Sequence, residues 1–160
     1  MLWMSCFVLA AILILINIAF TKKERSAKTI LGIINLYLLV MMAGVVCIFA
    51  AWAHIFRADE IARMIGWPTG SPFQFEVAMM NLALGVLGVL CIWFRGDFWL
   101  ATAINMSVLF LGCAYGHLRS AIVSHDYAPY NAGLGIWFYD VIIPILILTL
   151  VIVHRSIRER

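Results

Sequence analysis

Histidine and carboxylate side chains concentrate in a few short stretches of a chain that is otherwise apolar. His54, His117 and Asp140 lie within or at the ends of hydrophobic runs, and His125 and Asp126 lie in a polar stretch between two of them. Imidazole and carboxylate together bind zinc, iron or copper, and histidines from two helices can ligate a haem. The same groups relay protons, because imidazole titrates near neutral pH. The pattern therefore indicates either a polar site or a hydrogen-bonded network that ties loops to helices.

The candidate residues fall into two sets. The candidate metal ligands are His54, His117 and His125. The candidate polar cluster comprises Gln74, Glu76, Asn81, Asp126, Asn131 and Asp140. Each residue also has a structural interpretation, since Glu76, for example, can stabilise the positive end of a helix dipole. The four cysteines lack the spacing of a redox motif and are interpreted as packing residues. Because the chain contains no HExxH motif and no paired CxxC motif, a functional site and a structural network both stay open.

Long apolar runs must position these side chains. The chain has 160 residues, of which 65% are hydrophobic and 12% are charged, whereas about a quarter of the residues in a soluble domain are charged. Five runs come close to or exceed the roughly 20 apolar residues that cross a bilayer, and none alternates like a transmembrane strand. The sequence predicts an all-α integral membrane protein, with five transmembrane helices bundled in one domain over residues 1–160. The predicted spans are residues 2–20, 30–56, 76–94, 99–118 and 136–153.

Basic residues predict the orientation of these helices. One side of the membrane receives eight basic residues, and the other receives Arg57, Arg63 and Arg119. Basic loops face the cytoplasm, so the N-terminus is expected outside and the C-terminus inside. The first run lacks a preceding basic region and a following cleavage site, and we interpret it as a retained helix. The six tryptophans lie near span ends and are interpreted as interfacial anchors. The eight basic residues are Lys22, Lys23, Arg25, Lys28, Arg95, Arg155, Arg158 and Arg160.

The stretch GWPTGSPFQFE interrupts the apolar pattern in the first outer loop. Just before it, Ile61, Met64 and Ile65 follow helical spacing, which predicts a short helix that lies in the outer interface and ends at Gly66 and Pro68. Pro68 and Pro72 stiffen the segment that follows, and Gly66 and Gly70 permit a tight backbone turn. We therefore expect this loop to hold the polar side chains at the start of the third span over the mouth of the bundle.

The third and fourth spans each carry one face of small and polar residues. Small residues allow helices to approach closely, and asparagine can form a hydrogen bond across the interface. We expect the two faces to meet in the hairpin between these spans, or one of them to contact a second copy of the chain. The faces comprise Asn81, Gly85 and Gly88 in the third span, and Asn105, Gly112 and Gly116 in the fourth.

Three motifs carry a resemblance to a known family. They are GWPTGSPFQFEVAMMNLALG, the dipeptide GH at residues 116–117, and DYAPYNAG at residues 126–133. They resemble an uncharacterised family of small prokaryotic inner-membrane proteins, which carries a domain-of-unknown-function label and is similar in size and topology to DoxX-like proteins. The resemblance covers the C-terminal two-thirds of the chain and implies a helical membrane bundle with no established activity. It implies that Gln74, Glu76, Asn81, His117, Asp126 and Asn131 recur in the family.

Three functions from different classes fit these features. The first is a redox or transfer protein that binds a transition metal or haem at its outer face. The second is a noncatalytic membrane subunit or oligomer whose outer loops dock a partner. The third is an oligomeric, proton-linked small transporter. All three place the chain in the inner membrane as a multi-pass protein, in contact with lipid and with a second copy or a partner subunit. No nucleic-acid motif occurs, and whether the protein is an enzyme stays open.

Overall fold

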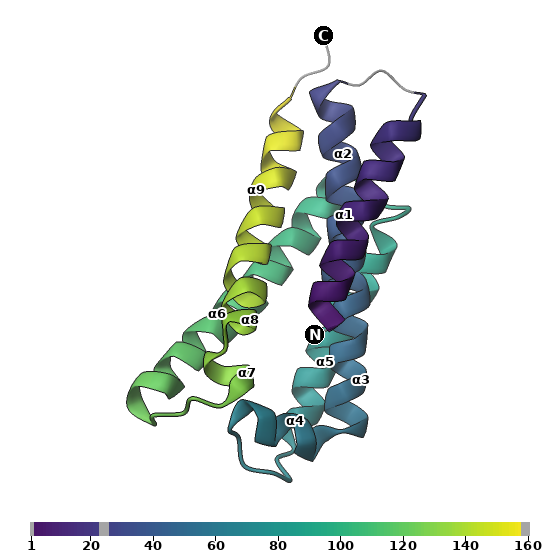
Figure 1. Cartoon of the computed structure of the whole chain (residues 1–160). Helices are drawn as coiled ribbons and strands as arrows, with labels where there is room; N and C mark the ends of the chain where they lie inside the picture. Colours follow the sequence, from purple (N-terminus) through teal and green to yellow (C-terminus); the bar gives the residue numbers. More distant parts are fainter. Residues whose placement is uncertain (1, 23–25, 158–160) are drawn as a thin grey trace.

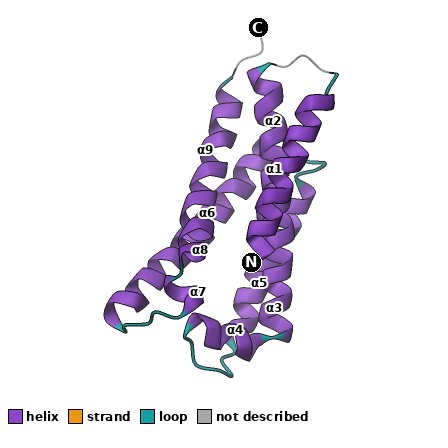
Figure 2. Cartoon of the chain, in the orientation of Figure 1, coloured by secondary structure: helices purple, strands orange, loops and turns teal. Residues whose placement is uncertain are grey.

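Helices make up the folded part of the chain. The computed structural model describes residues 2–22 and 26–157, and within these ranges it contains helices and no strand (Figures 1 and 2). The predicted orientation also uses Lys23, Arg25, Arg158 and Arg160, which lie outside the described residues. The elements are α1 (Leu2–Phe20), α2 (Ala27–Leu38), η1 (Leu39–Val45), α3 (Val46–Phe56), α4 (Ala58–Ile65), α5 (Phe73–Leu90), α6 (Asp97–Val123), α7 (Pro129–Ala132), α8 (Leu134–Trp137), η2 (Phe138–Ile142) and α9 (Ile143–Ser156).

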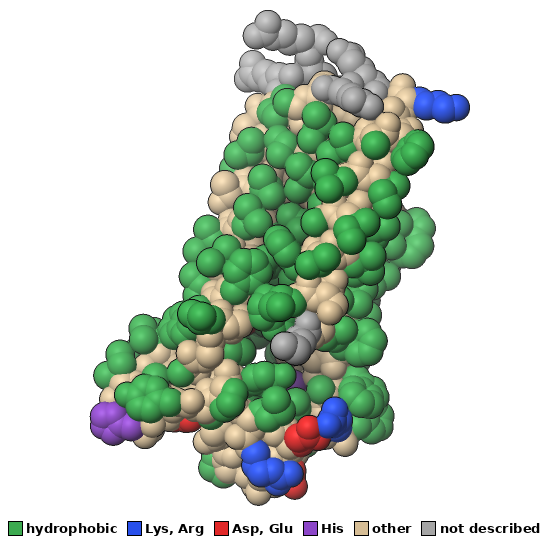
Figure 3. Space-filling model, viewed as in Figure 1, with side chains coloured by type: hydrophobic (Ala, Val, Ile, Leu, Met, Phe, Trp, Pro, Cys, Tyr) green, Lys and Arg blue, Asp and Glu red, His purple; other side chains and the backbone are tan. Residues whose placement is uncertain are grey.

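Five helical runs are long and apolar enough to cross a membrane, which confirms the all-α class and the predicted number of candidate spans. They are Leu2–Phe20, Ala27–Phe56, Phe73–Leu90, Asp97–Val123 and Pro129–Ser156. On the face seen in Figure 3, apolar side chains cover the bodies of the helices, whereas charged side chains appear only near the two ends.

Local capping decides where the runs begin and end. The second run begins at Ala27, three residues before the predicted start, because Ser26 Oγ accepts the backbone N–H of Thr29 at 3.2 Å and caps the helix. The short helix α4 ends at Gly66. The φ of this glycine is +91°, which is the left-handed conformation that favours glycine. The predicted short helix therefore forms, with Ala62 and Ile65 buried.

The five runs pack as two groups that diverge at one end. α5 packs along η1 and α3, with α1 beside α2, whereas α6 packs on α9 and η2. Contacts of α2 with α9 and of η1 with α6 join the groups. Figure 1 shows α6 sloping away from α3 and α5 toward α7, while α4 contacts α3, α5 and α7. We call the end of the bundle that contains α4 and α7 the α4 end. We call the opposite end, where α2 begins and α9 ends, the basic end.

The small-residue faces do not meet in the hairpin, and that prediction is wrong. A Cβ atom added to Gly88 would lie 2.2 Å from the backbone N of Gly44, so the face of α5 packs against η1 instead of α6. A Cβ added to Gly112 or Gly116 of α6 would meet no atom within 4 Å. The sequence identified both faces, but the partner of the first is η1, which is three elements earlier in the chain.

Two stretches of π-helix, η1 and η2, interrupt the second and fifth runs. At the end of η1 the N–H of Val46 bonds to the carbonyl of Met41, five residues back. Where four-residue spacing resumes, the carbonyl of Met42 is skipped by the helical pattern. η2 ends similarly, with the N–H of Ile143 bonded to the carbonyl of Phe138, just before Pro144, which has no N–H to donate. Such turns leave backbone carbonyls available to side chains.

Trp99 is buried, unlike the other tryptophans. The prediction that it anchors the protein at the membrane interface is therefore wrong. Its side chain is 2% exposed, and Nε1 donates to the carbonyl of Cys91 at 2.9 Å. The ring lies beside His154, with centroids 5.7 Å apart, and under the guanidinium of Arg95. Trp99 is therefore a core residue that connects the α5–α6 turn to α9.

Candidate functional site

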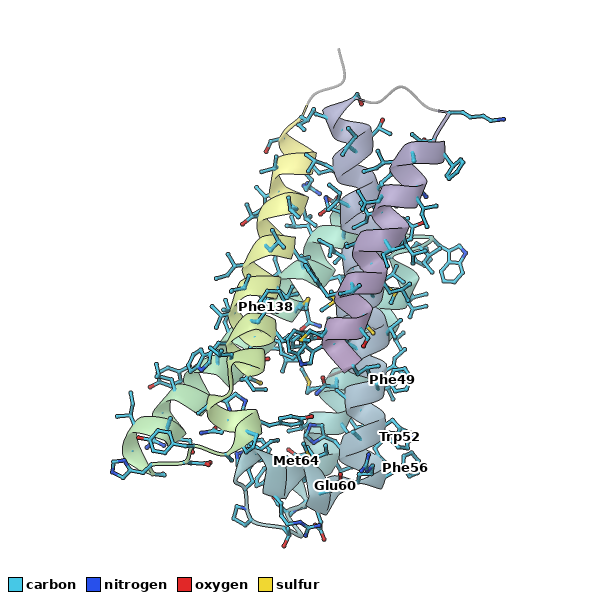
Figure 4. The ribbon with its side chains drawn as sticks, in the orientation of Figure 1. Phe49, Trp52, Phe56, Glu60, Met64 and Phe138 are labelled. Atoms are coloured by element: carbon cyan, nitrogen blue, oxygen red, sulfur yellow. The ribbon has the colours of Figure 1, made fainter. Side chains whose placement is uncertain are left out.

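η2 directs three consecutive side chains toward three different neighbours. The ring of Phe138 contacts Trp3 and Phe7 of α1, with centroid distances of 5.5 Å to each ring, and Figure 4 shows Phe138 beside α1. The next side chain, Tyr139, reaches the second run, and Asp140 reaches α6. The wide π turn therefore makes η2 the centre of a site that lies between three helices.

The His117–Asp140 pair is the ionisable part of this site. His117 Nε2 lies 3.6 Å from Asp140 Oδ2, and both side chains are largely buried. On the opposite edge of the ring, His117 Nδ1 lies 2.8 Å from Asn131 Oδ1. The pair joins α6 to η2, within two of the candidate membrane-spanning runs.

Asn131 determines which nitrogen of His117 carries a hydrogen. The Asn131 amide nitrogen donates to the carbonyl of Asp126 at 2.6 Å and lies 3.4 Å from the carbonyl of His117, so its oxygen must face the ring. An amide oxygen only accepts, and therefore Nδ1 carries a hydrogen in both charge states of the ring. Nε2 is the ring nitrogen that faces Asp140.

Asp126 fastens the loop after α6 to the α4 end. Its Oδ1 accepts the N–H of Ala128 at 3.0 Å, and its Oδ2 accepts from Ser120 Oγ at 3.3 Å. A Cβ added to Gly66 would lie 2.2 Å from Asp126 Oδ2, so glycine at the end of α4 lets the two loops touch. Asp126 thus binds Asn131 through its carbonyl and packs against Gly66 at the end of α4.

Tyr139 joins the two π-helical turns. Its hydroxyl donates to the skipped carbonyl of Met42 at 2.7 Å, and the thiol of Cys47 lies 3.6 Å from the same hydroxyl. The ring is buried and packs edge-on against Phe110 at 4.8 Å. The Cys47 thiol also donates weakly to this carbonyl at 3.7 Å, and the shorter bond from Tyr139 joins η2 to η1, so the two interrupted helices stabilise each other.

We expect Tyr139→Phe to lower the free energy of unfolding by about 1–3 kcal/mol, because it leaves the buried carbonyl of Met42 without its strong donor. Thermal unfolding in detergent, followed by tryptophan fluorescence, measures the effect. Tyr115→Phe is the matched control, since Tyr115 is 70% exposed on α6. Equal melting temperatures for the two variants would show that the hydroxyl does not stabilise η1.

His54 belongs to a second polar pair on the other group of helices. His54 Nδ1 on α3 lies 2.5 Å from Gln74 Oε1 on α5, and Gln74 is 3% exposed. The Gln74 amide nitrogen is buried without a hydrogen-bond partner among the described residues. The pair fixes the first turn of α5 against the last turn of α3.

The remaining predicted site residues lie apart from both pairs. Glu76 and His125 are exposed, and the Asn81 amide donates to the carbonyl of Val77 in its own helix. The three candidate metal ligands therefore do not converge. Among the described residues, no three His, Cys, Asp or Glu side chains form a group that could hold a metal ion. The geometry gives the metal hypothesis no support, because His54 and His117 each bond to an amide in separate pairs.

Sequence reasoning missed Tyr139 and its partner, the carbonyl of Met42. A backbone carbonyl becomes available only when helical spacing changes, and no residue type in LVMMAGV signals that change. Pro144 was the one available signal for η2, since it removes a backbone donor inside an apolar run.

Comparisons with known proteins add a family but no activity. A family model described as a family of unknown function (DUF6790) matches residues 1–160. No curated protein and no solved structure matches the chain. The match agrees with the predicted resemblance to an uncharacterised family and extends it over the first helix.

Proposed function

This chain belongs to DUF6790, a family of unknown function, and we propose that it is a small proton-linked membrane transporter whose His117–Asp140 pair binds and releases the coupling proton. The burial of this pair within candidate membrane-spanning runs carries the proposal. Ionisable side chains within membrane spans cost folding free energy and typically mark ion or proton pathways.

The charge state of the pair can control how α6 packs on η2. When Nε2 binds a proton, imidazolium and carboxylate attract each other across 3.6 Å. When the proton leaves, the lone pair of Nε2 faces the carboxylate and the attraction is lost. Because η2 is π-helical, with Tyr139 and Asp140 held by different helices, a change at this contact acts on both groups of helices. Proton binding is thereby coupled to the arrangement of the bundle.

The surface supports a multi-pass location in the inner membrane, with the α4 end outside. Phe49, Trp52 and Phe56 are exposed along α3, and Figure 4 shows them on its side away from α9. Aromatic side chains at this level suit the boundary between lipid and water. α4 has Arg63 exposed at the same end, while Ile65 packs against the protein. The excess of basic residues predicted at the opposite end supports the orientation.

Proton flux into liposomes tests the function. The protein is reconstituted with a pH-sensitive dye inside the vesicles, and an imposed pH gradient and potential drive the flux. We expect Asp140→Asn and His117→Gln each to reduce the initial rate at least about a hundredfold, the lower limit for removing a positioned proton-transfer group.

Asp59→Asn provides the matched control for the flux measurement. The same exchange is made at the α4 end, where Asp59 is exposed and Oδ1 still accepts the N–H of Gly70 after the change. The proposal would be overturned if Asp140→Asn showed wild-type proton flux while its melting profile showed that the variant is folded. Wild-type protein that conducts no more than empty liposomes would also overturn it.

A specific observation favours the oligomer as a second candidate. Gly112 and Gly116 make no contact that a Cβ would disturb, and Val108 and Tyr115 beside them are 71% and 70% exposed. A helix face with small residues and no partner among the described residues suits a second copy. Cross-linking in membranes tests this candidate, and Gly112→Leu should abolish the dimer band. Dimers that survive Gly112→Leu would exclude this face.

A further inference from the structure

Asn35 of α2 is a buried amide with one unpartnered atom. Its side chain is 0% exposed, and Nδ2 donates to the carbonyl of Leu150 on α9 at 3.1 Å. A carbonyl cannot donate, so the amide nitrogen must face Leu150 and the amide oxygen must face elsewhere. That oxygen, Oδ1, has no hydrogen-bond partner among the described residues. The core of the bundle therefore contains an acceptor without a donor.

The fold itself does not need this amide. The carbonyl of Leu150 lies inside α9, where helical spacing already pairs it with the N–H of His154. A buried acceptor without a donor costs folding free energy, so a leucine of similar size would be more stable at position 35. Buried polar groups of this kind commonly bind water. Asn35 is therefore better explained by a molecule that it binds than by the packing of α2.

A cavity of about 450 Å³ lies next to Asn35 at the basic end. Gly32, Ile33 and Leu36 of α2 line it, so it extends along this helix to the residue that follows Asn35. Its lining also includes Arg95, whose side chain is exposed. The cavity thus leads from the surface of the basic end to the level of Asn35.

Acceptor groups continue along α9 from this level toward the proton pair. Ser107 Oγ of α6 donates to the carbonyl of Pro144 at 3.3 Å. Pro144 has no N–H, so the carbonyl of Asp140, four residues earlier, lacks its helical donor. At a rise of about 1.5 Å per residue, the carbonyls of Asp140, Pro144 and Leu150 follow one another at intervals of about 6 and 9 Å.

Ile147 closes the longer of these intervals. Its side chain is 0% exposed and lies on α9 between Pro144 and Leu150. A buried apolar side chain at such a place excludes water and so blocks the passage of protons. A coupled transporter must prevent free proton flow, and this closed interval meets that need. Because α9 continues directly from η2, a change at the pair can move Ile147.

Building on the proposed function, we propose that the proton leaves the His117–Asp140 pair toward the basic end and that Asn35 positions the water that carries it into the cavity. The imidazolium of His117 gives its Nε2 proton to a water and becomes neutral. Each following water accepts one proton and gives up another. Asn35 Oδ1 accepts an O–H from the last water of this row, which passes its proton to water in the cavity. Asn35 gains no proton and is a positioning residue.

Asn35→Leu tests the route in the liposome flux assay. We expect the initial rate to fall about fivefold, the factor that corresponds to one neutral hydrogen bond. The melting temperature should be no lower than that of wild type, because the exchange removes an unpartnered acceptor. Asn81→Leu is the matched control, since Asn81 is also buried and its amide donates to a helical carbonyl. Its flux should stay near the wild-type value.

Nuclear magnetic resonance of ¹⁵N-labelled histidine separates the route from the pair. Asn35→Leu should leave the His117 signals as in wild type, because it acts beyond the pair, and a change in these signals would overturn a role in the route alone. Wild-type flux in Asn35→Leu, or a clearly lower melting temperature, would also overturn the inference. If Asp140→Asn still abolished flux, the proton pair would stand and only the route would fail. Wild-type flux in Asp140→Asn would instead refute the proposed function.

Discussion

Gly88→Ala should separate α5 from η1 and strongly destabilise the protein. The new Cβ would lie 2.2 Å from the N and 2.5 Å from the Cα of Gly44, and 2.6 Å from the C of Ala43. All three are backbone atoms of another helix, so no side-chain rotation relieves the overlap. Overpacking costs about 1–3 kcal/mol, and we expect a loss at the upper end, near 3 kcal/mol. For a chain of this size, that corresponds to a fall of roughly 6–12 °C in melting temperature.

Gly112→Ala is the matched control for this prediction. The same substitution is made inside α6, where the added Cβ meets no atom within 4 Å. Alanine is the better helix former, so this variant should gain up to about 1 kcal/mol. Thermal unfolding in detergent compares the two variants. If Gly88→Ala melts no lower than Gly112→Ala, the close contact of α5 with η1 does not exist in the protein.

Asn131→Leu should be the most damaging polar substitution at the site. Leucine resembles asparagine in size, but it neither accepts from His117 Nδ1 nor donates to the carbonyl of Asp126. Each buried polar group left unpaired costs about 1–3 kcal/mol, so two such groups cost about 2–6 kcal/mol. The ring of His117 would also lose the contact that orients Nε2 toward Asp140. We therefore expect both a lower melting temperature and a loss of proton flux.

Asn81→Leu separates the network from burial alone. Asn81 is also buried, but its amide donates to the carbonyl of Val77, which the helical backbone of α5 already satisfies. Replacing it leaves no unpaired buried group, and both stability and flux should stay near the wild-type values. Equal losses in Asn81→Leu and Asn131→Leu would mean that any buried asparagine matters and that the network around His117 has no special role.

Long apolar runs determined the helices, because a helix satisfies its own backbone groups with local bonds. The five runs, the cap at Ser26 and the end of α4 at Gly66 all follow from neighbouring residues, and the sequence predicts each run. The boundaries moved by a few residues wherever a cap or a turn lay outside the apolar stretch, as at Ala27.

Contacts between helices were decided only by the tertiary structure. The pairing of His117 with Asp140, the contact of Gly88 with Gly44 and the burial of Trp99 join residues far apart in sequence. Apolar side chains on a helix that crosses lipid favour no particular neighbour, since lipid and protein are similarly apolar. Residue types therefore predicted that polar groups need partners, and only the packing of the helices selected which partners they found.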